Sequence, residues 1–127
     1  MKRKTGQWVR KAEEDWQGAQ ELSAREPPLR DLASFHCQQA AEKYLKALLQ
    51  ENGIAFPKTH DLELLLGLLL PIDKNLATLS RGLSSLTEFA VEYRYPGTRA
   101  TTRRMQSAKR LAEKVRREIR QRLGLTE

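Results

Sequence analysis

Apolar residues recur every three or four positions through most of this chain, with polar residues between them. This spacing indicates amphipathic α-helices, because an α-helix completes a turn about every 3.6 residues. Proline and glycine interrupt the pattern and mark the expected helix ends. The pattern predicts helices over residues 5–24, 31–52, 60–70, 72–93 and 101–123.

Asp31 is expected to cap the second helix, and Gly53 to end it. No strand-like alternation of useful length occurs, and the loops are short. The sequence therefore predicts an all-α fold, an antiparallel up-and-down helical bundle of four long helices and one short helix, in one domain over residues 1–127. The predicted apolar stripe of the first helix is Trp8, Ala12, Trp16, Ala19 and Leu22. That of the fourth is Ile72, Leu76, Leu79, Leu83, Leu86, Ala90 and Tyr93.

Composition supports a folded domain and shows where the charge lies. With 39% hydrophobic residues, a chain of 127 residues can form a core. Its 23 basic and 16 acidic residues give a net charge of +7. Residues 1–98 hold 13 of each sign, so residues 99–127, with 10 basic and 3 acidic side chains, carry the whole excess. A cationic segment of this kind favours an anionic partner.

Several classes of protein are excluded by the same inventory. Cys37 is the only cysteine, so no internal disulfide can form. No apolar segment follows the basic N-terminus, as a signal peptide would require. The longest apolar run, residues 62–72, is about half the length that spans a bilayer. One cysteine and two histidines make no zinc cluster, and no phosphate-binding glycine motif occurs. We expect a cytoplasmic protein without membrane contact, metal or cofactor.

The second predicted helix has a polar side opposite its apolar residues. In one interpretation this side is solvated, and Glu42 and Lys46 form a helix-stabilising pair of about 0.2–0.5 kcal/mol. In the other, it is a cationic, hydrogen-bonding stripe that faces a ligand or a partner chain. Its members are His36, Gln39, Lys43 and Lys46, with Gln50 at the end.

The same helix carries the first part of a family resemblance. Residues 33–49, ASFHCQQAAEKYLKALL, resemble the signature helix of HEPN domains. WVRKAEED at 8–15, THDL at 59–62 and YRYP at 93–96 are similar to further landmarks of the family, in the same order. The resemblance implies a helical bundle that usually dimerises. It also implies a frequent pairing of small members with a minimal nucleotidyltransferase, and binding or processing of RNA or nucleotides.

HEPN ribonucleases carry an arginine, then four to six residues, then a histidine near the start of the last helix. These supply the cation and the base that metal-free RNA cleavage needs. Arg94 stands at the expected place, but no histidine follows residue 60. Arg30 and His36 match the spacing formally, on the wrong helix. We therefore expect no catalytic residue, with Arg30 and His36 as the alternative. His60 is expected to cap the third helix or to pack under the preceding loop.

Two segments are candidates for nucleotide or RNA binding. In the loop before the last helix, Tyr93 and Tyr95 can stack a base while Arg94 holds a phosphate. Alternatively, Tyr93 completes the apolar stripe of the fourth helix and Tyr95 packs at the corner of the bundle. Arg94 would then lie at a subunit interface, paired with a carboxylate. The last helix is strongly cationic, and repulsion between like charges four residues apart would be relieved by an anionic partner. Its candidates are Arg103, Lys109, Arg110, Lys114 and Arg117, with Arg116 and Arg120 beside them.

The sequence thus favours a non-catalytic HEPN-type subunit that binds nucleotide or RNA. By resemblance it forms a homodimer or higher oligomer and partners a minimal nucleotidyltransferase, in a toxin–antitoxin or related system. The alternatives are a HEPN ribonuclease toxin and a purely structural oligomer with a basic surface.

Overall fold

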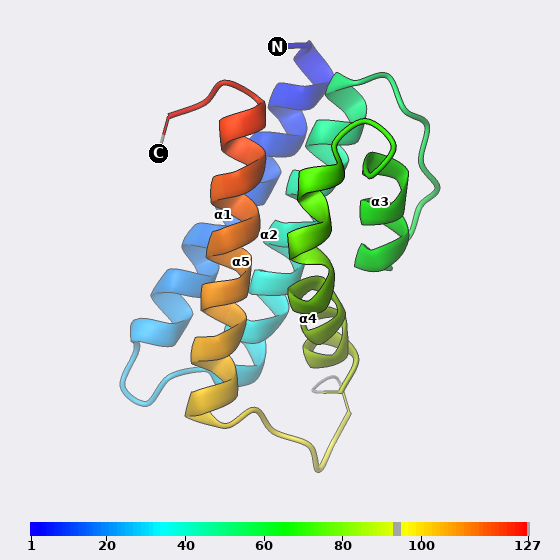
Figure 1. The fold of residues 1–127 in the computed structure, drawn as a ribbon. Coiled ribbons are helices and arrows are strands. Elements are labelled where there is room, and N and C mark those ends of the chain that lie inside the picture. The colour runs from blue at the N-terminus through cyan, green and yellow to red at the C-terminus, as the bar shows by residue number, and fades with distance from the viewer. Residues whose placement is uncertain (93–94, 127) are drawn as a thin grey trace.

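The computed structural model describes residues 1–92 and 95–126 and, within them, contains helices and no strands (Figure 1). Consecutive long helices run in opposite directions, so the predicted up-and-down bundle is confirmed. The elements are α1 at Arg3–Ala24, α2 at Arg30–Glu51, α3 at Leu62–Leu69, a 3₁₀ helix η1 at Lys74–Leu79, α4 at Ser80–Glu92 and α5 at Thr102–Arg122.

α2 is the central helix of the bundle. α1 packs along it, and α3, α4 and α5 contact it from other sides. Thirteen of its 22 residues are buried, among them the polar Gln38, Glu42 and Lys46. Because a buried polar group is costly without a partner, the surroundings of α2 must supply hydrogen bonds as well as apolar contacts.

The apolar stripes of α1 and α5 meet α2. Ala12 and Ala19 are buried as predicted, but the buried face of α1 is turned toward Val9 and Asp15. Trp8 and Trp16 are partly buried and pack against the core from its edge. On α5 the buried residues recur every three or four positions, as the predicted amphipathic helix requires. They are Met105, Ala108, Ala112, Val115 and Ile119.

The predicted start of α2 is wrong in one detail, and its end is right. α2 begins at Arg30 without a side-chain cap. Asp31 instead accepts a hydrogen bond from the backbone N–H of Ala100, at 2.6 Å, and so holds the chain just before α5. Gly53 has a φ of 67°, and the N–H of Ile54 donates to the carbonyl of Leu49 at 3.0 Å. This left-handed ending is one that glycine adopts without strain.

The predicted fourth helix is two elements, η1 and α4. Asp73 accepts a hydrogen bond from the N–H of Asn75 at 3.1 Å and starts η1, so Ile72 lies outside the helix and is 52% exposed. Leu76 and Leu79, three residues apart, are both buried, which suits the period of a 3₁₀ helix. Assigning Ile72 to the stripe was therefore wrong. The last two members of that stripe fall outside the described part of the structure: the side chain of Ala90 and the whole of Tyr93.

Candidate functional site

α5 divides its cationic side chains between the interior of the bundle and its outer surface. Inside, Arg116 donates to both oxygens of Glu13 on α1, at 2.7 and 2.8 Å. Arg120 donates to the hydroxyl of Tyr44 at 3.2 Å and lies 3.6 Å from Glu13. The repulsion between these two arginines is thus relieved within the chain. The expectation that an external anion relieves the repulsion between Arg116 and Arg120 was therefore wrong.

The Glu13 cluster also includes a hydrogen bond from the Tyr44 hydroxyl to the Glu13 carboxylate. Burial and this hydrogen bond raise the pKa of Tyr44 to about 12. Partial burial alone would raise the pKa of Glu13, but the hydrogen bonds from Arg116 and Tyr44 outweigh it and hold that pKa below 4.5. The cluster joins α1, α2 and α5 through one ionised carboxylate.

Replacing Glu13 with glutamine is expected to destabilise the protein more at neutral pH than in acid. The folded-state pKa of Glu13 is depressed, so its contribution to stability is complete above the ordinary value of 4.5. That contribution is lost as pH falls through the folded-state pKa. Urea unfolding at about pH 7 and about pH 3 measures the difference between wild type and variant. Glu14→Gln, one position along on the exposed side of α1, is the control. An equal difference at both pH values would contradict the assignment.

The outward side of α5 is different. We call Arg103, Arg110, Lys114 and Arg117 the outer basic stripe. All four are exposed and lie seven, four and three residues apart, so they follow one side of the helix for about 21 Å at 1.5 Å per residue. Lys109 is partly buried on its flank. In the described part of the chain the stripe has one ion pair, Arg117 with Glu113 at 3.9 Å, and both partners are more than half exposed. Such a pair contributes little.

The loop before α5 lies partly outside the described residues, which do not include Tyr93 and Arg94. Tyr95 is 68% exposed, so the alternative that it packs the corner of the bundle is wrong. Arg30 donates to the carbonyl of Ala100 at 2.8 Å, beside the Asp31 contact. The first turn of α2 therefore fixes the end of this loop and the start of α5.

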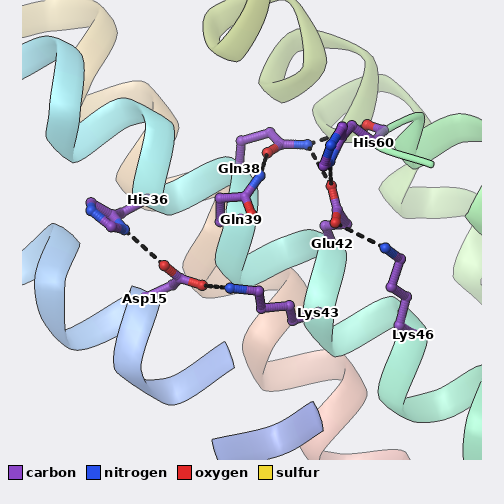
Figure 2. Close-up of polar contacts among 8 residues, drawn as sticks. All are labelled: Asp15, His36, Gln38, Gln39, Glu42, Lys43, Lys46 and His60. Atoms are coloured by element: carbon purple, nitrogen blue, oxygen red, sulfur yellow. Dashed lines mark hydrogen bonds and ion pairs between the residues drawn. The ribbon is translucent and has the colours of Figure 1, made fainter. Parts of the chain in front are cut away.

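The predicted polar stripe of α2 makes its hydrogen bonds within the chain: His36 and Lys43 contact α1, and Gln39 and Lys46 pair with other residues of α2 (Figure 2). Nδ1 of His36 lies 2.7 Å from one oxygen of Asp15 on α1, and Lys43 donates to the other. Lys46 is 9% exposed and donates to Glu42, which is 4% exposed, at 3.0 Å. The interpretation as a solvated face is therefore wrong for this pair, because α2 is enclosed by its neighbours.

Gln39 and His60 belong to the same network. Gln39 donates to Gln38 at 2.7 Å, and Gln38 donates to Glu42 and to the carbonyl of His60, both at 3.3 Å. Nδ1 of His60 lies 2.8 Å from Glu42, although the His60 side chain is 75% exposed. The cap of α3 is Asp61, whose carboxylate accepts hydrogen bonds from two backbone N–H groups of the first turn, at 3.1 Å each. His60 therefore does not cap α3. It holds the loop to α2.

The alternative catalytic pair is not brought together within the chain. Arg30 and His36 are six residues apart on α2, which separates them by about 9 Å along the axis and about 120° around it. Arg30 contacts the loop before α5, whereas His36 contacts Asp15 on α1. The Asp15 carboxylate orients the imidazole, but no arginine in the described residues joins it there.

Other chemistry is limited in the part of the chain that the structure describes. No three His, Cys, Asp or Glu residues there form a group that could hold a metal ion. Burial raises the pKa of Cys37 to about 12, so its thiol stays protonated and inert at neutral pH. No helix among these residues has the length and apolar character to cross a bilayer.

Sequence reasoning missed the acidic partners on α1. Glu13 and Asp15 hold cationic and titratable side chains of α2 and α5, yet neither was singled out. One signal was available: Asp15 falls among the apolar positions of α1, between Ala12 and Ala19. An acid at a core position predicts a buried cationic partner.

The geometry defines a class of protein: a small helical bundle whose central helix buries several polar side chains and whose last helix carries cationic side chains on its outer surface. The HEPN domain family matches residues 5–122, and the chain belongs to this family. The chain is similar to an archaeal HEPN homologue, ST0689, with a TM-score of 0.75 and 26% identity over 96% of this chain and 98% of that one. The fold also resembles TT1696 from Thermus thermophilus, with a TM-score of 0.75 and 23% identity over 94% and 98% of the two chains. No curated protein matches.

Proposed function

We propose that this chain is a non-catalytic HEPN subunit that binds RNA or nucleotides through the outer basic stripe. One observation carries the proposal: among the described residues, the inward-facing Arg116 and Arg120 of α5 pair with Glu13, whereas the four cations of the outer basic stripe have no comparable partner. Arg110 and Lys114, four residues apart, form no ion pair within the described residues. An anion bound along α5 relieves their repulsion.

The chemistry of the stripe suits phosphates. Arginine and lysine contacts to a phosphate backbone supply affinity by releasing counterions, and they carry no sequence information. The exposed ring of Tyr95, close to the start of α5 in sequence, offers a stacking surface for one base. Sequence-tolerant binding of single-stranded RNA is the mode that these features support.

A titration of short, labelled single-stranded RNA at two salt concentrations tests the proposal. Four phosphate contacts, at a slope of about 0.7 each, predict an affinity about 50-fold lower at about 200 mM than at about 50 mM salt. The RNA recovered from each titration should be intact on a denaturing gel. Absence of binding at the lower salt, or binding insensitive to salt, would contradict the role of the stripe. Cleavage would contradict the non-catalytic part.

The remaining parts of the proposal are supported by family membership. They are self-association, with a solution mass above the 14.6 kDa of one chain, and partnership with a minimal nucleotidyltransferase in a toxin–antitoxin or related system. A cytoplasmic location fits binding to RNA. The absence of catalysis is supported by the sequence, which has no histidine after residue 60 to complete a pair with Arg94.

A further inference from the structure

A second region combines aromatic and cationic groups, at the opposite end of α2 from the loop that precedes α5. A surface pocket of about 410 Å³ lies between the first half of α1, the end of α2 and the loop after it. This volume is within the range of small-molecule sites. The pocket is lined by Lys4, Gln7, Trp8, Lys11, Gln50 and Phe56.

The aromatic part of the pocket is held in place by the fold. The rings of Trp8 and Phe56 meet edge to face, with centroids 6.1 Å apart and planes at 62°. Nζ of Lys46 lies 5.4 Å from the centroid of the Trp8 ring and is itself fixed by Glu42. A ligand ring therefore meets an indole that is already positioned, which limits the entropy lost on binding.

The charge of the pocket is positive. Lys4 and Lys11 are seven residues apart, so they lie on the same side of α1 as Trp8 between them. Both are exposed and make no ion pair within the described residues, and no acid lines the pocket. An anion bound beside the Trp8 indole can therefore be contacted by the ammonium group of Lys4 or by that of Lys11. The amides of Gln7 and Gln50 offer hydrogen bonds at the rim.

We propose that this pocket binds a small planar aromatic anion, an aromatic ring that carries one carboxylate or phosphate. The ring contacts Trp8 and Phe56, and the anionic group contacts Lys4 or Lys11. The proposal does not depend on RNA binding by the outer basic stripe, which belongs to α5 and does not contribute to the pocket.

Fluorescence of Trp8 in a Trp16→Phe background reports binding directly. The probes are benzoate and adenosine monophosphate, with inorganic phosphate and adenosine as controls that have only the anion or only the ring. We expect a saturable change with at least one ring-bearing anion at about 1 mM or below. We expect both controls to bind at least about tenfold more weakly. Whichever probe binds identifies the anionic group, carboxylate or phosphate.

A pair of matched variants places the site. Lys4→Ala/Lys11→Ala should weaken binding of the anion at least about tenfold, because it removes both ammonium groups. Arg25→Ala/Lys74→Ala removes the same charge elsewhere and should leave binding unchanged. All four side chains are exposed, so both variants are expected to fold. No saturable change with either anion, equal binding of a control probe, or equal loss in the two variants would overturn the proposal.

Discussion

Replacing Glu42 with alanine is expected to lower the free energy of unfolding by about 3–5 kcal/mol, because removing one partner of a buried ion pair leaves the other uncompensated. Glu42 is 4% and Lys46 9% exposed, and Glu42 also accepts a hydrogen bond from Gln38. Without the carboxylate, the Lys46 ammonium keeps, among the described residues, only its contact with the Trp8 ring, whose centroid lies 5.4 Å away. Urea unfolding followed by circular dichroism measures the loss.

Two controls separate a broken pair from general disturbance of α2. The double variant Glu42→Leu/Lys46→Met removes both charges at similar volume and should recover most of the loss, since a buried pair is often replaceable by apolar residues. His60→Ala removes the exposed partner of Glu42 and should cost about 1 kcal/mol or less. If Glu42→Ala costs less than about 1 kcal/mol, the pair does not organise the central helix as described.

The second large effect concerns the outer basic stripe. Arg110→Glu/Lys114→Glu should lower affinity for single-stranded RNA at least about 100-fold, or about 2.7 kcal/mol, because two phosphate contacts are lost and two repulsions are added. Both residues are exposed and make no ion pair in the described part of the chain, so the variant should fold as the wild type does. Fluorescence anisotropy with labelled RNA measures the affinity.

The helices were predictable because their signals are local. Apolar spacing, proline and glycine determine where each one begins and ends within a few residues, and Gly53 ends α2 as expected. Ile72 was misassigned because the register of the following segment depends on the Asp73 cap and on 3₁₀ winding. A regular α-helical projection cannot represent that change of period.

The distribution of charge was only partly predictable. The sequence identified α5 as the cationic element, and its family resemblance was correct. It did not separate Arg116 and Arg120 from Arg110 and Lys114, because that division depends on Glu13, about a hundred residues away in sequence. The same dependence on distant residues applies to α2. An amphipathic projection assumes that one side of the helix is solvated, whereas the bundle encloses both sides of α2.

The central claim is that the outer side of α5, and not the overall positive charge, binds RNA. The most direct test is a parallel RNA titration of wild type, Arg110→Glu/Lys114→Glu and a control, Arg25→Glu/Lys58→Glu, at about 50 mM salt. The control changes net charge equally at two exposed sites outside α5. The account predicts a loss of at least about 100-fold for the α5 variant and at most a few-fold for the control. Equal losses in the two variants would show that net charge alone drives binding, and would contradict it.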